Sequence, residues 1–455
     1  MNNKEVSLSL NSQLSLNENS KILVVGLGET GFSVAKFLHQ HAFSFAVIDS
    51  RNKPPFNDAL LQDFPDTPVF TGRFDKTAFD VATHLIVSPG ISLQEELIQK
   101  ALLSGTKLIS DIDLFACSTN KPIIAITGSN GKSTVTTMLG AMGNAANKKT
   151  AIGGNLGKPA LDLLKEDVEL YVIELSSFQL ERISALNASV ATVLNISADH
   201  MDRYDNLVSY AEEKQNVFSG NGIMVLNEDD AIVMAMKRKD RESFTFSVTN
   251  KTGFHLETQQ GEEWLMNADQ PLMRKTDLSV EGLHNVANAL AALAIGTAAG
   301  LNTLAMCNAL SSFKGLDHRM QKIANIKGIT WINDSKATNI GACIAALKGY
   351  QKKVILIAGG DAKGADIQEL IPFIKEKTKC VVLLGKDAEK IDKAINGSVP
   401  SFRAKTIQEA VQISATLAKK GESVLLSPAC ASIDQYKNYQ ERGDKFIAAV
   451  MELAA

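Results

Sequence analysis

The chain has 455 residues, 45% of them hydrophobic and 21% charged, with a formal net charge of -3 at pH 7. At roughly 150 residues per domain, this length predicts about three domains, each able to bury its own core. The near balance of charges provides no basic face for nucleic acid, so we expect no such partner. The longest apolar stretch, residues 289–301, is shorter than the ~20 residues of a membrane helix, so no membrane partner is expected either.

The cysteines and the N-terminus indicate the compartment. Five cysteines are scattered along the chain without a C-x-x-C pair, which predicts reduced thiols and no disulfide framework. The N-terminus lacks the basic and apolar regions of a secretory signal. We therefore expect a cytoplasmic protein, and we interpret the Ser/Asn-rich residues 1–20 as a flexible or loosely docked tail.

Short β-branched runs alternate with helical patterns in three successive series. These series begin with the strands KILVVG, KPIIAITG and ITWINDS. The alternation predicts an α/β fold, with parallel sheets and crossover helices. Boundaries near residues 110 and 315 divide the chain into domains at 21–110, 111–315 and 316–455. We expect ligands between these domains, at the carboxyl ends of the strands.

The first series contains a glycine-rich turn. Gly26, Gly28 and Gly31 form a G-x-G-x-x-G motif that follows an apolar strand and opens a helix. Such glycines let the backbone approach a pyrophosphate at the helix N-terminus. NAD binding, binding of another diphosphate such as a UDP-sugar, and a purely structural turn all remain open. The segment 88–90, Ser-Pro-Gly, would lie at the same sheet edge or form a plain turn.

The second series opens with a stronger motif. A strand leads into a Gly-rich loop that ends in Gly131, Lys132 and Ser133 at the start of a helix. The backbone N–H groups of such a loop cradle phosphates, the lysine neutralises charge, and the serine ligates Mg²⁺. Ile126 stands where the first glycine of G-x-x-x-x-G-K-[ST] would be, so the match is incomplete. The motif predicts ATP, rather than NAD, as the cofactor.

Polar residues follow several other predicted strands. Glu174 ends one strand and is placed to hold Mg²⁺. His200 alone would more often be a hydrogen-bonded loop residue, but the charges of the surrounding segment 199–204 favour function. Asn288 caps a helix or contacts a base. In the third series, three polar clusters at 333–339, 359–363 and 427–432 together predict a ligand site. Their cationic and hydroxyl donors suit an acidic substrate.

These motifs, in this order, resemble those of the Mur ligase family from residue 21 to the C-terminus. The segments that carry the resemblance are TGSNGKST, ELSSFQLE, DHMDRY, HNVANALAA, HRM, NDSKATN, GGDAKGAD and LSPACASIDQYKNYQERG. The family implies three domains: a Rossmann-like N-terminal domain, a central P-loop ATPase-type domain and a Rossmann-like C-terminal domain. It also implies that the glycine turn holds UDP rather than NAD.

The NDSKATN and LSPACAS stretches resemble the member of the family that adds D-glutamate. This likeness implies an ATP-dependent ligase that joins D-glutamate to UDP-N-acetylmuramoyl-L-alanine through an acyl phosphate and a tetrahedral intermediate. ADP and phosphate are the other products of this bacterial, cytoplasmic step of peptidoglycan precursor synthesis. ATP and Mg²⁺ are the implied cofactors, and a monomer is the implied state.

The resemblance also assigns roles residue by residue. Residues implied to contact the UDP substrate are Gly28, Thr30, Ser50, Arg51, Ser88, Pro89, Gly90, Asn155, Gln179 and His200. Residues implied to contact ATP are Gly128, Ser129, Asn130, Gly131, Lys132, Ser133, Thr134, Asn288, Arg319 and Asp334. Those implied for D-glutamate are Thr338, Lys363, Ser432 and Tyr439. Those implied for Mg²⁺ are Ser133, Glu174, His200 and a carbamylated Lys214. The implied catalytic residues are Lys132, Glu174, His200, Lys214 and Lys336.

Two positions depart from the family pattern. Ser50 stands where threonine is usual, and Tyr439 where phenylalanine is usual, which leaves details of substrate fit open.

Three other functions compete with this one. An NAD-dependent dehydrogenase would leave Lys132 and the third domain unexplained. A non-catalytic nucleotide-binding regulator would not need the clustered lysines of the third domain. A sister ligase for another amino acid is the nearest competitor.

Overall fold

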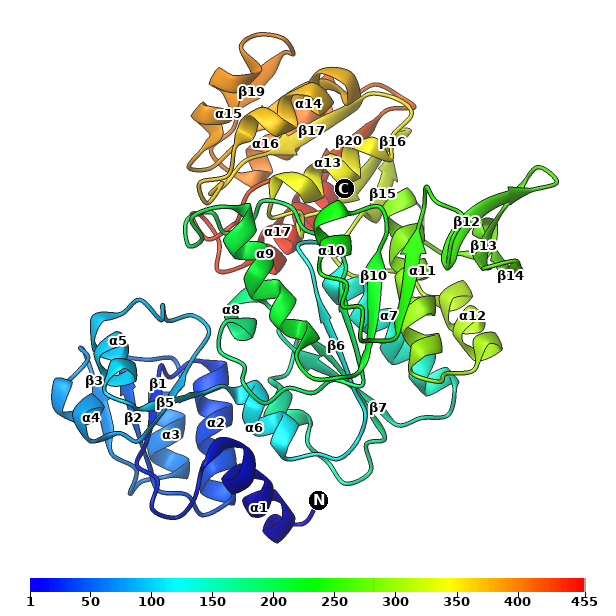
Figure 1. Ribbon diagram of the computed structural model, residues 1–455. Coiled ribbons are helices and arrows are strands. Elements are labelled where there is room, and N and C mark those ends of the chain that lie inside the picture. Colours follow the sequence, from blue (N-terminus) through cyan, green and yellow to red (C-terminus); the bar gives the residue numbers. More distant parts are fainter. Residues whose placement is uncertain (281, 454–455) are drawn as a thin grey trace.

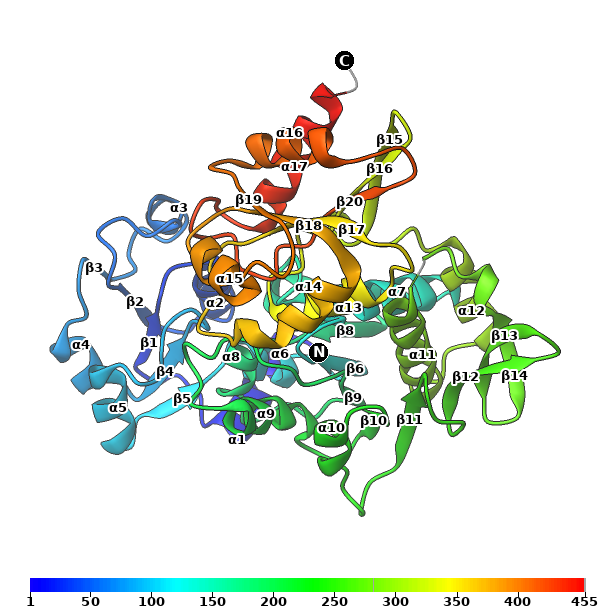
Figure 2. The same ribbon diagram turned by 90° about the horizontal axis from the view of Figure 1, so that it is seen from above.

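The structure is a computed structural model, and it describes residues 1–280 and 282–453. Three sheets follow one another along the chain, and each carries its own helices (Figure 1). We call the three units the N-terminal, central and C-terminal domains. The C-terminal domain (yellow to red) covers one end of the central domain, and the N-terminal domain (blue) lies to one side of it (Figures 1 and 2).

The N-terminal domain is built on a five-stranded parallel sheet in the order β3-β2-β1-β4-β5. Its strands are β1 Ile22–Val25, β2 Phe45–Asp49, β3 Val69–Thr71, β4 His84–Val87 and β5 Lys107–Ile109. Its helices are α2 Glu29–Gln40, α3 Asn57–Asp63, α4 Lys76–Val81 and α5 Glu96–Leu103. The strand order reverses between β1 and β4, so the loops after β1, β2 and β4 meet at one edge of the sheet.

The expectation of a flexible tail over residues 1–20 is wrong, because these residues contain helix α1, Asn3–Leu14. Asn2 and Glu5 form a capping box at its start. Val6, Leu10 and Leu14 recur every four residues and are buried, and the helix packs against α6, Asp111–Cys117. The Ser/Asn-rich composition concealed this apolar stripe, which is enough to dock one face of a helix.

The central domain contains a nine-stranded sheet in the order β14-β13-β12-β11-β10-β9-β6-β8-β7. Its strands are β6 Ile123–Thr127, β7 Thr150–Gly154, β8 Leu170–Glu174, β9 Val190–Val193, β10 Ile223–Asn227, β11 Ser243–Ser247, β12 Phe254–Gln259, β13 Glu262–Asn267 and β14 Gln270–Arg274. Strands β12 to β14 are antiparallel and project from the side of the domain (Figure 1). The parallel strands carry the loops of the site at their carboxyl ends.

Short and long helices cover this sheet. They are α7 Lys132–Ala145, α8 Ser177–Leu180, α9 Leu207–Gln215, α10 Ala231–Ala235, α11 Leu283–Ala298 and α12 Thr303–Ser312. Single turns of 3₁₀-helix occur at η1 Ala160–Leu163, η2 Asn216–Phe218 and η3 Lys275–Asp277. The Ala/Leu-rich α11 packs on α7 and is buried over most of its length, as its apolar sequence predicts.

The C-terminal domain has a six-stranded sheet in the order β15-β16-β20-β17-β18-β19. Its strands are β15 Gln321–Ile326, β16 Ile329–Asn333, β17 Val354–Ala358, β18 Thr378–Leu383, β19 Ser401–Arg403 and β20 Ser423–Leu426. Its helices are α13 Ile340–Lys348, η4 Ile367–Leu370, α14 Ile371–Lys377, α15 Ala388–Ile395, α16 Ile407–Leu417 and α17 Tyr439–Glu452. Because β16, β20 and β17 are neighbours, the three polar clusters that follow them lie at one sheet edge.

Positions 110 and 315 fall in the connections between sheets. All five cysteines are buried and unpaired, and burial raises the pKa of each thiol. Of the helices within the described residues, none has the length and apolarity that crossing a bilayer requires.

Candidate active site

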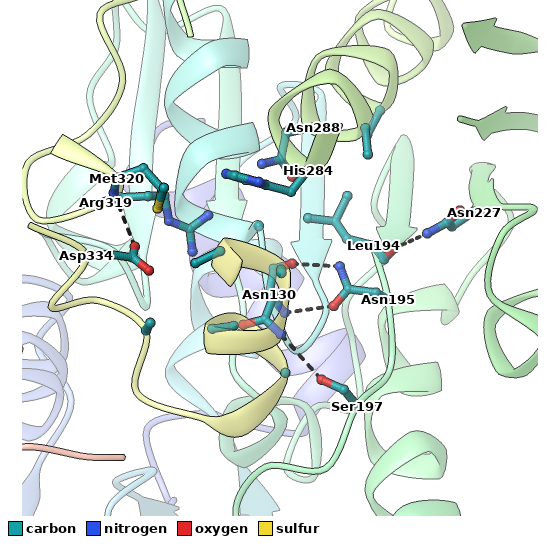
Figure 3. A pocket seen from close by; sticks show the side chains of 18 of the residues that line it. Asn130, Leu194, Asn195, Ser197, Asn227, His284, Asn288, Arg319, Met320 and Asp334 are labelled. Carbon is teal, nitrogen blue, oxygen red and sulfur yellow. Dashed lines mark hydrogen bonds between the residues drawn. The ribbon is translucent and has the colours of Figure 1, made fainter. Parts of the chain in front are cut away.

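The phosphate-binding loop predicted from the sequence connects β6 to α7. Gly128 and Gly131 have φ angles of 145° and 88°, which favour glycine. A Cβ at Gly131 would lie 2.5 Å from Asn288 Oδ1, so a side chain there would collide with α11. Asn195 Oδ1 accepts a hydrogen bond from the Asn130 amide at 2.8 Å, which fastens the loop to the segment after β9 (Figure 3). Contacts with α11 and with the segment after β9 therefore constrain the conformation of this loop.

The Lys132 side chain folds back over this loop. Its Nζ donates to the carbonyl oxygens of Gly128 at 2.6 Å and Ser129 at 2.9 Å. Burial lowers the Lys132 pKa, while the carboxylates of Glu174 and Asp199 act in the opposite direction. A phosphate in the loop would offer this ammonium group anionic oxygens in place of neutral carbonyls.

A cavity of about 270 Å³ lies between the central and C-terminal domains beside this loop. It is lined by five residues that the sequence analysis assigned to ATP: Asn130, Gly131, Asn288, Arg319 and Asp334. The other five, Gly128, Ser129, Lys132, Ser133 and Thr134, form the loop and the first turn of α7. Arg319 crosses from the C-terminal domain, and its Nη1 donates to Thr134 Oγ1 at 2.8 Å. The two domains together thus enclose the space (Figure 3).

Other lining residues were missed by the sequence analysis. They include Asn195, Asn227, Phe246, His284 and Met320 (Figure 3 labels all but Phe246). Asn227 and Phe246 have a signal in the sequence, because they lie at the carboxyl ends of β10 and β11. His284 stands in the HNVANALAA segment, four residues before Asn288.

Glu174 is the last residue of β8, and among the described residues only one of its two carboxylate oxygens has a hydrogen-bond donor. Its Oε1 accepts a hydrogen bond from Asn155 Nδ2 at 2.8 Å, whereas Oε2 is buried without a hydrogen-bond partner among the described residues. A bare, buried carboxylate oxygen is unfavourable unless a cation compensates it. The negative charge of Glu174 raises the pKa of Lys132, Lys336 and Arg319 against the effect of burial, so those cations lie around it.

This arrangement fits Mg²⁺ bound together with phosphates. Within the described part of the chain, no three His, Cys, Asp or Glu side chains come together as metal ligands. Mg²⁺ in phosphate sites takes only one or two carboxylates and completes its shell with phosphate oxygens and water. Glu174 Oε2 and the buried Ser133 at the start of α7 meet that need.

Lys214 is a buried lysine on α9 that points at the same loop. Its Nζ donates to Thr127 Oγ1 at 3.3 Å and to Gly128 O at 3.1 Å. Burial, followed by the charge of Lys132, holds the Lys214 pKa well below its usual value. A neutral amine is nucleophilic, so this environment is compatible with the expected carbamylation.

His200 and its neighbour Asp199 lie where the central and C-terminal domains meet. Burial lowers the pKa of His200 to about 4, so the ring is neutral at pH 7. Asp199 Oδ2 accepts a hydrogen bond from Asn339 Nδ2 at 3.1 Å, and Lys363 Nζ lies 3.5 Å from its Oδ1. Burial alone would raise the Asp199 pKa, but the positive charges of Lys363 and Lys132 and the hydrogen bond from Asn339 help to hold it below its usual value.

Of the residues assigned to D-glutamate, Tyr439 contacts Lys336, which the resemblance assigned to catalysis and not to this substrate. Lys336 Nζ donates to Tyr439 OH at 2.9 Å, so these two side chains meet. Burial, followed by the charge of Arg319, lowers the Lys336 pKa to about 8. Lys363 instead faces Asp199. Thr338 lies two residues beyond Lys336, and Ser432 is buried in the loop after β20.

A second cavity, of about 510 Å³, opens at the sheet edge of the N-terminal domain. Seven of the residues assigned to the UDP substrate line it: Gly28, Thr30, Ser50, Arg51, Ser88, Pro89 and Gly90. Asp49 organises this edge, because its carboxylate accepts hydrogen bonds from the Leu27 amide at 2.8 Å and from Arg51 Nε at 2.9 Å.

The other three residues assigned to this substrate are on the central domain. Asn155 contacts Glu174, and His200 adjoins Asp199. Gln179 Oε1 accepts a hydrogen bond from the Ser176 amide at 3.1 Å as part of the capping box of α8. These three side chains are therefore separate from the N-terminal cavity, on the loops and short helix of the neighbouring domain.

Comparisons with known proteins identify the family to which the three domains belong. Three family models match successive parts of the chain: the Mur ligase MurD-like N-terminal domain at residues 20–110, the Mur ligase middle domain at 126–296, and the Mur ligase glutamate ligase domain at 318–430. These matches confirm the predicted three-domain α/β fold and the predicted family.

Individual relatives extend over nearly the whole chain. A protein of Methylococcus capsulatus named UDP-N-acetylmuramoylalanine--D-glutamate ligase is 51% identical over 444 residues, or 97% of each chain. One of the same name from Pseudomonas aeruginosa is 46% identical over 95% of this chain and 98% of its own. The structure of the alanine ligase MurC from Thermotoga maritima shares the fold, with 17% identity, a TM-score of 0.61, and coverage of 95% of this chain and 100% of its own. The chain belongs to the Mur ligase family.

Proposed function

We propose that this protein is an ATP-dependent ligase that joins D-glutamate to UDP-N-acetylmuramoyl-L-alanine, giving ADP and phosphate. The names of relatives up to 51% identical over nearly their full length support this activity. The observation that carries the proposal is the bare Glu174 carboxylate oxygen, surrounded by Lys132, Lys336 and Arg319 beside the cavity between two domains. That arrangement suits transfer of a phosphoryl group.

The reaction proceeds in two steps. The carboxylate of UDP-N-acetylmuramoyl-L-alanine attacks the γ-phosphorus of ATP, ADP leaves, and an acyl phosphate forms. The amine of D-glutamate then attacks the acyl carbon, and the tetrahedral intermediate expels phosphate and loses the amine proton. Activation is necessary because a carboxylate is a poor acyl donor at neutral pH.

The protein contributes positioning and positive charge. Lys132 and the loop amides hold the β- and γ-phosphates, and Arg319 closes the nucleotide cavity from the other domain. Lys336 balances negative charge on the transferred phosphoryl group. Ser133, Glu174, His200 and a carbamylated Lys214 would hold Mg²⁺, which would add charge neutralisation at the phosphates.

Each domain has its own substrate in this proposal. Residues 21–110 bind the UDP moiety, and Asn155, Gln179 and His200 of the central domain receive the muramoyl-alanine end. Residues 111–315 bind ATP. Residues 316–455 bind D-glutamate through Thr338, Lys363, Ser432 and Tyr439. We also propose that the protein is a monomer and that it acts in the bacterial cytoplasm, where ATP and nucleotide-linked precursors are available.

Phosphate release over a panel of amino acids tests this function. We expect release only when ATP, UDP-N-acetylmuramoyl-L-alanine and D-glutamate are all present. L-alanine and meso-diaminopimelate should not replace D-glutamate. Turnover with one of those amino acids in place of D-glutamate would identify a sister ligase, and release without any amino acid would contradict a ligase.

Replacing the loop lysine tests the nucleotide assignment. Lys132→Ala should lower kcat by roughly 100-fold or more, because a preorganised cation at the transferred phosphoryl group is removed. Lys149→Ala, at a surface lysine of the same domain with a 66% exposed side chain, is the matched control and should keep wild-type kcat. Near-normal turnover of Lys132→Ala would show that the loop does not bind the phosphates.

A further inference from the structure

Two arginines of the central domain reach across to the loop that lines the N-terminal cavity. Arg203 follows β9 in the DHMDRY segment. Its Nη2 donates to the Ile91 carbonyl at 3.2 Å, and its Nη1 donates to the Pro89 carbonyl at 3.4 Å. Arg182, just after α8, also donates through Nη2 to the Ile91 carbonyl. Three hydrogen bonds from one domain therefore converge on loop 88–91 of the other.

The two guanidinium groups are themselves fixed. Glu181 Oε1 accepts from Arg203 Nη2 at 2.8 Å and also from Arg182 Nη1, so one carboxylate bridges the pair. Arg182 has a side chain only 1% exposed. The Arg203 Cζ lies 4.2 Å from the centroid of the Phe178 ring, which makes an edge-on contact with the His200 ring. The pair is thus anchored to the segment that ends at the proposed muramoyl-alanine site.

Loop 88–91 is in turn packed against the glycine turn of the cavity. Ser88 Oγ donates to the Gly26 carbonyl at 2.9 Å. A Cβ at Gly26 would lie 2.6 Å from Ile91 Cδ1, so the Ile91 side chain fills the space that the missing Cβ leaves. Fixing the Ile91 carbonyl therefore also fixes the contact between the loop and the turn.

A second contact joins the same two domains away from this loop. Ser33 Oγ on α2 donates to Asp162 Oδ1 at 2.8 Å, and Lys36 Nζ lies 2.8 Å from the same oxygen. This contact does not involve the arginines, so Ser33 offers a control for the loss of a contact between the same two domains.

We infer that Arg203, supported by Arg182 and Glu181, is a positioning residue for the UDP substrate. It holds the backbone carbonyls of Pro89 and Ile91, so that loop 88–91, which lines the N-terminal cavity, keeps the shape that receives the uridine diphosphate. The inference rests on the proposed assignment of this cavity to UDP. It concerns substrate binding in the N-terminal domain and leaves the nucleotide and amino-acid sites unchanged.

Calorimetric titration of UDP-N-acetylmuramoyl-L-alanine into the full-length protein, without ATP, tests this role. Arg203→Ala should raise the Kd about tenfold, as expected for lost hydrogen bonds from a charged donor. The KM for this substrate should rise by the same factor, with kcat and the KM values for ATP and D-glutamate unchanged. The Kd of Arg203→Lys should lie between those of the wild type and Arg203→Ala, because lysine keeps the charge but cannot span both carbonyls. Ser33→Ala, the control at the second contact, should bind as wild type does.

The outcomes separate this role from the alternatives. Equal Kd values for wild type and Arg203→Ala would overturn the inference while leaving the proposed function intact. An equal loss in Ser33→Ala, or a parallel rise in the KM for ATP, would show general loosening between domains and would also overturn it. If the wild-type protein fails to bind the substrate, the proposed function itself is wrong, and the inference falls with it.

Discussion

The lysines around the phosphate-binding loop differ in how far their surroundings lower their pKa values. Lys214 is buried and donates to a hydroxyl and a carbonyl oxygen, which carry no full charge, and its pKa is far below the usual value. Lys336 is less extreme, with a pKa of about 8 that burial sets first and Arg319 lowers further. Its charge is therefore lost within the pH range in which an enzyme can be assayed.

The pH dependence of activity follows from this value. Lys336 is cationic below its pKa of about 8 and neutral above it, so kcat/KM should fall as pH rises through that region. In Lys336→Arg the guanidinium keeps its proton, and the alkaline fall should move to higher pH even if the rate at neutral pH is lower. Initial rates from about pH 6 to about pH 10 would show this. An exposed control, Lys352→Arg, should keep the wild-type profile, and an unmoved fall in Lys336→Arg would contradict the assignment.

The amino-acid site can be tested at Lys363. Lys363→Ala should raise the KM for D-glutamate by roughly tenfold, because the carboxylate of this substrate loses a charged partner. The KM for ATP should stay the same. Lys386→Ala, at a neighbouring lysine with a 60% exposed side chain, is the control. An unchanged KM for D-glutamate in steady-state kinetics would remove Lys363 from the site.

Residues within motifs were predictable, and residues defined by distant partners were not. Glu174 ends a β-strand, Asp334 directly follows one, and Lys132 begins the helix after the phosphate-binding loop, so spacing along the chain locates them. Arg182 was missed, because its partner Ile91 is 91 positions away and belongs to another domain. The position of Lys363 against Asp199 was missed for the same reason, since it depends on how two domains meet.

At the scale of elements, α1 shows that composition can conceal a helix. Serine and asparagine dominate residues 1–20, yet Val6, Leu10 and Leu14 form one buried stripe. The surface that receives the stripe, α6, begins only at Asp111, far along the chain from α1. A local pattern could have predicted the helix, but it could not have predicted that the helix docks.

Shortening one side chain of this stripe should destabilise the N-terminal domain. Leu10 is 0% exposed, so Leu10→Ala should lower the free energy of unfolding by about 2–4 kcal/mol through lost contacts and a cavity. Leu8 lies on the opposite face, is 61% exposed and serves as the control. Leu8→Ala should change the free energy of unfolding by less than about 0.5 kcal/mol. Urea unfolding followed by circular dichroism measures both. Equal stability of the two variants would mean that α1 is not docked in solution.

At the scale of the whole molecule, a few polar contacts hold the C-terminal domain against the central one. Asn339 is the centre of this group: its Nδ2 donates to Asp199 Oδ2 at 3.1 Å and to Asn130 Oδ1 at 3.3 Å. Arg319 adds its hydrogen bond to Thr134. The contacts reach the phosphate-binding loop itself, so the closure of the domains and the shape of the nucleotide cavity are linked.

Replacing Asn339 with aspartate should open the molecule. Asn339 Oδ1 caps α13 by accepting from the Ala342 amide at 2.8 Å, and aspartate preserves such a cap. A carboxylate would face Asp199, however, and the like charges should repel. Small-angle scattering should give a larger radius of gyration for Asn339→Asp than for wild type, together with a lower kcat. Asn302→Asp, at the cap of α12, is the control, and equal radii of gyration for Asn339→Asp and wild type would refute the role of Asn339 in closure.

The five buried thiols of this enzyme can report local unfolding through the rates at which they are alkylated. Alkylating reagents attack thiolates, and burial both shields these sulfurs and raises their pKa, so the folded protein should react slowly. Each cysteine becomes reactive only when its own surroundings open. Cys117 on α6 reports release of α1, Cys307 reports the α12 side of the central domain, and Cys343, Cys380 and Cys430 report the C-terminal domain. Timed alkylation read by mass spectrometry would thus rank the parts of one unmodified chain by how often they unfold.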